Sequence, residues 1–122
     1  MTDGREKALQ IVEFTLNKQA IDPVILDVRS VSTFCDYFVI CSGESPRQVE
    51  AILNETLQLS KKCQMPAHHS ERDEESTWML VDFEDVVLHI FLDEFRKFYD
   101  LEHLWKEAKK IRIPKKFFKT PS

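Results

Sequence analysis

The sequence predicts a single α/β (α+β) domain in which a mixed β-sheet of about five strands is flanked by helices. Two long segments, 3–19 and 45–62, carry apolar residues at helical spacing. Four shorter segments have the length and apolar pattern of strands, and a fifth, short strand is expected in a polar segment. At 122 residues, with 43% apolar and 31% charged residues, the chain has the size and composition of one globular domain.

The first helix, 3–19, begins with capping-box spacing between Asp3 and Glu6, and Pro23 closes it off. Segment 24–29 then alternates apolar and polar residues, as a half-buried strand does. The side chains expected to share its apolar face are Val24, Leu26 and Val28.

Residues 37–41 are apolar throughout, which indicates a strand covered on both faces. The helix that follows has Ser45 as its N-cap and Pro46 at its first helical position. Gln48 stands three residues after the cap. Ser45 and Gln48 can therefore satisfy free N–H groups at this helix end, a contribution of roughly 1 kcal/mol.

A polar segment follows this helix and holds one short edge strand around 67–70. Two strongly apolar strands, 78–83 and 86–92, come next, and only two residues separate them, which predicts a tight hairpin. Neither Glu84 nor Asp85 favours a positive φ, so we expect a bulge in this turn.

A short helical turn at 95–99 leads to a last helix, 100–109, with Asp100 as its N-cap. Residues 109–122 are expected to form a basic, flexible tail outside the domain, which spans 1–108. The side chains expected to close a small aromatic core are Leu101, Leu104 and Trp105.

The net charge of −4 is divided unevenly along the chain. Residues 1–108 hold 11 basic and all 21 acidic residues, so they carry −10, whereas 109–122 carry +6. An acidic domain is a poor match for a phosphate backbone and suits a basic protein partner. An acidic surface is equally typical of a soluble protein without such a partner.

Three cysteines cannot all pair within one chain, so we expect reduced thiols at Cys35, Cys41 and Cys63. The N-terminus lacks the apolar core of a signal peptide, and no apolar run is long enough to span a membrane. We expect a cytoplasmic protein.

The sequence gives little support for catalysis. A nucleophilic Cys or Ser needs a neighbouring His that an acid orients, but Cys41 and His89 are each central in a strand. The segment Ser42-Gly43, between a strand and a helix, resembles the glycine turn of nucleotidyltransferases. Those enzymes need paired carboxylates on a strand, whereas Asp82 and Asp85 here lie on either side of a turn. We therefore expect no enzymatic activity.

The residues Cys63, His68 and His69 form the one cluster of metal-ligand types, but a second ligand pair is missing. A solvated loop is the simpler interpretation, and we expect neither metal nor cofactor. Ser45 and Arg47 at a helix N-terminus could bind an anion, although capping alone explains Ser45.

Three ordered blocks, which together cover about residues 5–108, resemble the ribosomal silencing factor (Iojap) family. The first runs from Asp36 to Gly43 and continues with Ser45, Arg47, Gln48 and Val49. The second contains Trp78, Leu80, Asp82, Asp85, Val86, Val87, His89 and Phe91. The third contains Arg96, Tyr99, Leu101, Glu102, Leu104 and Trp105.

The resemblance implies a nucleotidyltransferase-like fold without the catalytic carboxylates. It also implies binding to the fourteenth protein of the large ribosomal subunit, which would block joining of the small subunit under nutrient limitation. Family members commonly form homodimers. The residues that we expect to contact the ribosomal protein or a second copy are Trp78, Leu80, His89, Phe91, Arg96 and Tyr99.

This chain departs from the family pattern in two turns, where Arg72 and Glu84 replace glycine. Leu92 replaces a family His, and Phe98 replaces a family Tyr. The basic tail could make a weak contact with ribosomal RNA, and no small-molecule substrate is expected. Two alternatives remain, a nucleotide-binding protein of nucleotidyltransferase type and a dimeric adaptor unrelated to ribosomes.

Overall fold

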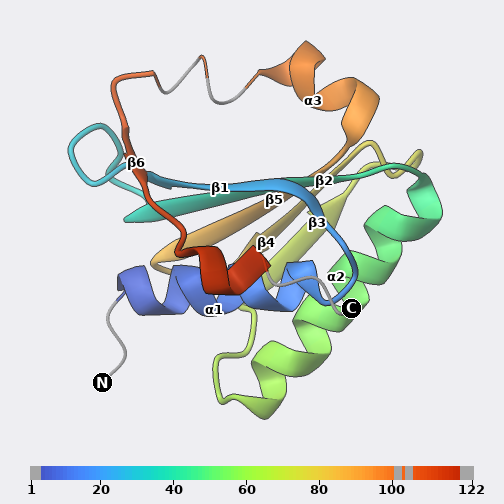
Figure 1. The fold of residues 1–122 in the computed structure, drawn as a ribbon, viewed down its shortest axis with the longest axis horizontal. Coiled ribbons are helices and arrows are strands. Elements are labelled where there is room, and N and C mark those ends of the chain that lie inside the picture. Colours follow the sequence, from blue (N-terminus) through green and yellow to red (C-terminus); the bar gives the residue numbers. More distant parts are fainter. Residues whose placement is uncertain (1–3, 101–102, 104–105, 119–122) are drawn as a thin grey trace.

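The computed structural model describes residues 4–100, 103 and 106–118. Within these ranges the chain forms one six-stranded sheet in the order β3-β4-β5-β2-β1-β6, with helices packed on it (Figure 1). The predicted α/β class is confirmed, with one strand more than expected. The elements are α1 (Gly4–Leu16), β1 (Ile21–Asp27), β2 (Tyr37–Gly43), α2 (Pro46–Lys62), β3 (His69–Arg72), β4 (Trp78–Asp82), β5 (Val86–Leu92), α3 (Asp93–Tyr99), β6 (Lys109–Ile111) and the 3-10 helix η1 (Lys115–Phe118).

The parallel pair β2 and β5 lies in the middle of the sheet, and the other neighbouring strands pair antiparallel. Six of the seven residues in each of these two strands are buried. Such strands must be covered on both faces, as their continuous apolar sequences predict.

The two faces of the sheet are covered unequally. Helices α1 and α2 pack on one face, and α3 lies over one end of the other (Figure 1). The main core lies under α1 and α2, and it includes Ile11, Ile25, Val39, Ile52, Phe83, Leu88 and Ile90. We call the opposite side of the sheet the open face; it presents Leu26, Phe38, Trp78, Leu80, Val87, His89 and Phe91.

The start of α2 has the predicted capping geometry. The Ser45 hydroxyl accepts a hydrogen bond from the Gln48 N–H at 3.2 Å. The Gln48 side-chain oxygen accepts from the N–H of Glu44 at 2.6 Å, one residue earlier than a capping box requires. The Gln48 amide also donates to the carbonyls of Lys18 and Gln19, so the same side chain joins the end of α1 to the start of α2.

Several boundaries differ from the predicted ones. Helix α1 ends at Leu16, and Asp3 lies outside the described residues. Pro23 does not precede β1 but lies inside it, at a bulge where the pairing with β2 shifts register. A proline is tolerated there because the ladder of hydrogen bonds is already interrupted. The edge strand begins at His69, two residues later than expected.

The C-terminal segment is where the prediction was wrong. The expected helix to residue 109 does not reach that far, because Lys109–Ile111 forms strand β6 beside β1. Ile111 lies opposite Ile25, and both Ile111 and Ile113 pack against the main core. Lys109 and Lys110 of this strand are exposed, whereas Ile111 and the following Ile113 are partly buried, so the segment joins the domain instead of forming a flexible tail.

Asp100 caps in a different way from the one expected. It is the C-cap of α3 and adopts a left-handed conformation, with φ 45°. Its carboxylate does accept a hydrogen bond from the N–H of His103 at 3.3 Å. The expected aromatic core residues Leu101, Leu104 and Trp105 lie outside the described residues.

The turn between β4 and β5 is tighter than a bulge. The N–H of Asp85 donates to the Phe83 carbonyl at 3.2 Å, and Glu84 between them has φ 82°. This is the γ-turn with positive φ at its central residue, a strained form. Glutamate therefore holds a conformation that glycine adopts freely.

Replacing Glu84 by glycine should raise the free energy of unfolding by about 1 kcal/mol, because the positive φ then carries no steric penalty. The exposed ion pair between Glu84 and His68 contributes little, so its loss should not offset this gain. Urea unfolding measures the change. Glu84→Ala is the control, because it removes the carboxylate and keeps the strain; an equal gain in both variants would contradict the explanation.

Candidate protein-binding face

Aromatic rings form a continuous cluster on the open face, with Trp78, Phe91, Tyr99 and His89 at its centre. The Trp78 ring stacks on Phe91 with 5.2 Å between centroids, and Tyr99 from α3 lies 4.8 Å from the Trp78 ring. His89 extends the cluster, at 5.9 Å from Trp78. Strand register explains this arrangement, because Trp78 is opposite Phe91 and Leu80 is opposite His89 in the β4–β5 pair.

His89 is a buried, neutral part of this cluster. Its Nδ1 accepts a hydrogen bond from Trp78 Nε1 at 3.1 Å, and only 5% of the residue is exposed. Among the described residues, its Nε2 atom is buried without a hydrogen-bond partner. Burial lowers the pKa of His89 to about 4, so the imidazole stays uncharged at neutral pH. His89 thus orients the Trp78 ring and adds no charge to the face.

Arg96 does not lie on the surface. Its guanidinium is directed into the protein, where it donates to the carbonyls of Ile21 at 3.1 Å and Asp22 at 2.8 Å. It also donates to the Ser42 hydroxyl at 3.2 Å, and that hydroxyl donates to Asp93 at 2.7 Å. Arg96 therefore fastens α3 to the ends of β1 and β2, and α3 in turn positions Tyr99.

The contacts of Arg96 also involve Ser42, one of the residues that resembled a nucleotidyltransferase site. Ser42, at the end of β2, is already bonded to Arg96 and Asp93 of α3. Asp82 accepts from the N–H of Glu84 at 2.7 Å, and Asp85 pairs with Lys7 at 2.8 Å. Each of these polar groups has a structural partner within the fold.

The other candidates for chemistry are likewise explained by their surroundings. Burial raises the pKa of Cys41 to about 12, which keeps this thiol protonated. His68 and His69 pair with Glu84 and Glu71, and Cys63 is exposed. Across residues 4–100, 103 and 106–118, no group of three His, Cys, Asp or Glu could hold a metal ion.

The accessible part of the open face consists of the outer edges of a few residues. Trp78, Leu80 and Tyr99 are half-buried, whereas His89 and Phe91 lie beneath them. Phe98 on α3 is 78% exposed, and its ring packs edge-on against Tyr99 at 5.4 Å. Phe98 was not among the predicted contacts, although its place beside Tyr99 in an aromatic-rich segment could have suggested it.

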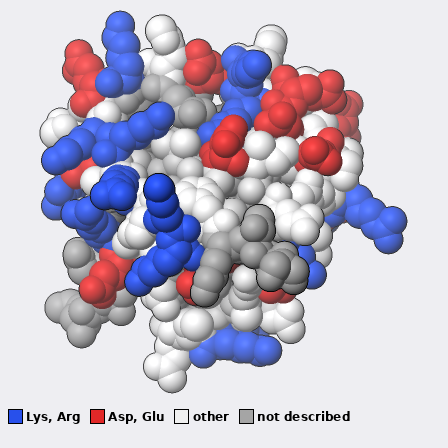
Figure 2. Space-filling view, in the orientation of Figure 1, with Lys and Arg blue, Asp and Glu red and all other residues white. Residues whose placement is uncertain are grey.

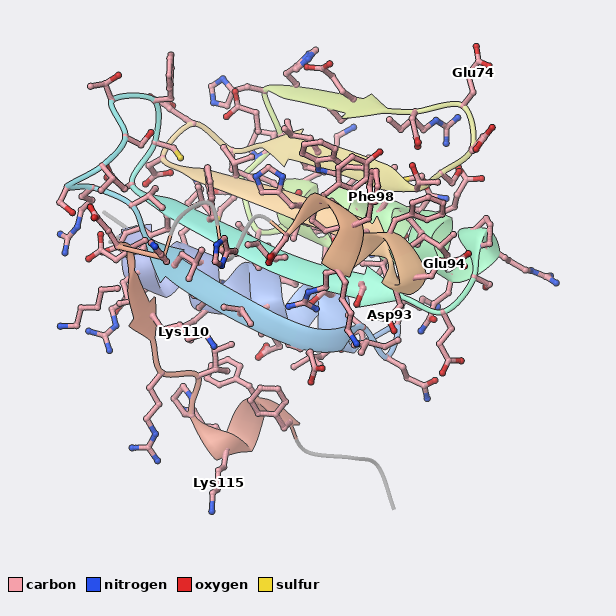
Figure 3. The ribbon with its side chains drawn as sticks, turned by 90° about the horizontal axis from the view of Figure 1, so that it is seen from above. Glu74, Asp93, Glu94, Phe98, Lys110 and Lys115 are labelled. Carbon is pink, nitrogen blue, oxygen red and sulfur yellow. The ribbon has the colours of Figure 1, made fainter. Side chains whose placement is uncertain are left out.

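Charge is distributed asymmetrically around this face. Figure 2 shows acidic side chains gathered on the side where α3 lies and basic ones on the side of β6. Viewed onto the open face, Glu74, Asp93 and Glu94 lie toward one end, and Lys110 lies on the β6 edge (Figure 3). An exposed aromatic patch with an acidic rim is suited to a basic protein surface.

Comparisons with known proteins find a matching family and a solved structure of similar fold. Residues 2–122 match the family model described as "Ribosomal silencing factor during starvation". A Bacillus subtilis protein named ribosomal silencing factor RsfS is 39% identical over 92 residues, covering 75% of this chain and 78% of its own. A crystal structure of a Chromobacterium violaceum protein superposes with a TM-score of 0.82 at 28% identity, over 92% of each chain.

Two organellar proteins are also similar. The mouse protein named "Mitochondrial assembly of ribosomal large subunit protein 1" is 34% identical over 98 residues, which are 78% of this chain and 43% of that protein. The chloroplastic protein Iojap of Zea mays is 32% identical over 107 residues, 88% of this chain and 46% of its own.

The buried, neutral state of His89 predicts a pH dependence of stability. Because its pKa is lowered in the folded state, the unfolded chain binds the proton first as the pH falls below about 6.5. Stability should therefore decline between pH 6.5 and 4, by roughly 3 kcal/mol from this group, and level off below. Urea unfolding across this pH range, compared with His89→Asn, isolates the effect. Parallel pH curves for the two proteins would rule it out.

Proposed function

The chain belongs to the ribosomal silencing factor family, and from this premise we propose that it binds the large ribosomal subunit and sterically prevents the small subunit from joining. The contact is made with a large-subunit protein, the fourteenth by the family resemblance. The open face with its acidic rim is the observation that carries this proposal. We place this activity in the cytoplasm, under nutrient limitation.

The uneven cover of the sheet supports a protein partner. The helices α1 and α2 leave the rings of Trp78 and Tyr99 and the side chain of Leu80 only half-buried on the other face. Aromatic residues of this kind supply much of the free energy at protein interfaces. A micromolar complex needs about 8 kcal/mol, which a few buried aromatic residues within a standard interface of about 800 Å² per partner can supply.

The names of relatives support a ribosomal partner in particular. The mouse relative is named for the assembly of the large ribosomal subunit, and the bacterial relatives are named as silencing factors. A regulator of this type acts by occupying space on the ribosomal subunit, so it needs no catalytic residues. The engagement of Ser42 by Arg96 and Asp93 argues in the same direction, against a nucleotide site at the end of β2.

We also propose that a second copy of the chain covers the open face when no ribosome is bound. The same half-buried aromatic side chains would serve both contacts, so self-association and ribosome binding would compete.

Within the described residues, no helix is long and apolar enough to cross a membrane.

Replacing Phe98 by alanine should weaken binding to isolated large subunits by about tenfold, since it removes an exposed aromatic ring from the proposed interface. Co-sedimentation through sucrose, followed by addition of small subunits, measures both binding and the block of joining. The same variant should shift the protein toward monomer in analytical ultracentrifugation.

Phe34→Ala is the matched control, because Phe34 is 91% exposed in the loop between β1 and β2, away from α3 (Figure 1). It should leave binding within twofold of the unchanged protein. Equal affinities for the Phe34 and Phe98 variants would remove α3 from the interface. Absence of the unchanged protein from large subunits at micromolar concentration would refute the proposed function itself.

The basic segment after β6 is proposed to contact ribosomal RNA weakly. Deleting everything from residue 110 onward would also remove Ile111 and Ile113, which pack against the core, so exposed charges should be neutralised instead. Changing Arg112, Lys115 and Lys116 together to glutamine should flatten the salt dependence of binding, by up to about 0.7 in logarithmic slope for each lost phosphate contact.

Neutralising the exposed Arg47, Lys61 and Lys62 of α2 changes the net charge equally and is the control for this experiment. Its salt dependence should match that of the unchanged protein. If both triple variants alter the slope equally, general electrostatic attraction explains the effect and the segment makes no specific contact with RNA.

A further inference from the structure

A cavity of about 320 Å³ opens beside Trp78 on the acidic side of the open face. Strand β3 provides one wall, and β4 together with Tyr99 from α3 provides the other. The cavity is large enough for the end of one long side chain. Its lining residues are Glu71, Arg72, Asp73, Trp78, Leu80 and Tyr99.

The walls combine aromatic rings with carboxylates. Glu71 pairs with Leu80 across the β3–β4 ladder, so both side chains project to the open face. Trp78 and Tyr99 meet at 4.8 Å between ring centroids and form the apolar part of the lining. A site with an aromatic ring beside a carboxylate favours a cationic group. The ring attracts the cation through its quadrupole, and the carboxylate attracts it through its opposite charge.

The Asp73 carboxylate is held in place and ionised. It accepts hydrogen bonds from the N–H groups of Thr77 at 2.7 Å and Trp78 at 3.2 Å, and also from the Thr77 hydroxyl. Burial raises the pKa of Asp73, but these hydrogen bonds outweigh that effect and hold the pKa below its ordinary value. Asp73 thus presents a negative charge at neutral pH.

Arg72 is the one basic residue in the described part of the lining, and its ion pair lies on the other side of the sheet. Arg72 pairs with Glu50 of α2, and its strand neighbour is Met79, whose side chain lies in the main core. The Glu71 carboxylate lies 2.9 Å from Nε2 of the exposed His69. The lining therefore includes two carboxylates, that of Asp73 and that of Glu71, which also contacts His69, whereas Arg72 is paired with Glu50.

We propose that this cavity receives one lysine or arginine side chain of the ribosomal protein to which the open face binds, an inference that rests on the proposed function. The aliphatic part of the incoming side chain packs on Leu80 and the ring of Trp78. Its cationic end lies between the aromatic wall and the carboxylates of Glu71 and Asp73. The insertion fixes the register of the partner on the face and buries a charge that has two opposite charges beside it.

The test is the affinity for isolated large ribosomal subunits of two variants with the same change in charge. Glu71→Gln removes a charge from the cavity without altering shape, and it should weaken binding five- to tenfold. Glu13→Gln removes a charge from an exposed residue of α1, which packs on the other face of the sheet, and it should stay within twofold of the unchanged protein. Both residues are exposed, so urea unfolding should give the same stability for both variants.

Three outcomes separate the two levels of the proposal. Weaker binding of Glu71→Gln alone supports the insertion of a cationic side chain. Equal affinities for the two variants, with the unchanged protein still bound to large subunits, would overturn the insertion and leave the proposed function intact. If the unchanged protein does not bind large subunits at all, both proposals fail.

Discussion

The central parallel pair of strands must be covered on both faces, and the helices within the described residues cover only one face completely. Strands β2 and β5 bury six of their seven residues each, and α1 and α2 account for one side of them. The other side is closed by aromatic rings and by the short helix α3. An apolar surface thereby remains half-covered at Trp78 and Leu80, and this surface is available to another protein.

The cover that α3 provides depends on a buried charge. A helix of seven residues is too short to be stable in isolation, so tertiary contacts must hold it. Arg96 supplies these contacts through three hydrogen bonds to β1 and β2. Because Tyr99 follows three residues later, the bonds of Arg96 also place the Tyr99 ring against Trp78. One side chain thus connects the stability of the fold to the shape of the proposed interface.

The sequence predicted the features that depend on neighbouring residues. Periodicity identified the strands and the face shared by Trp78 and Leu80, and the Ser45–Gln48 spacing identified the start of α2. The sequence did not predict the role of Arg96, because the backbone carbonyls that accept its hydrogen bonds lie 75 and 74 residues away in the chain. Strand β6 was missed because it is only three residues long and its pairing depends on the free edge of β1.

Rings and charges contribute differently to a contact of this kind. The rings of Trp78, Phe91 and Tyr99 exclude water from the centre, where the neutral state of His89 avoids the cost of a buried charge. Carboxylates at the rim attract a basic partner over longer distances and orient it before contact, so they act mainly on the association rate. Glu71 and Asp73 are carboxylates of the rim that also line the cavity beside Trp78, so they act both in attracting the partner and in the contact itself. Their position therefore makes them suited to select the orientation in which a basic surface is bound.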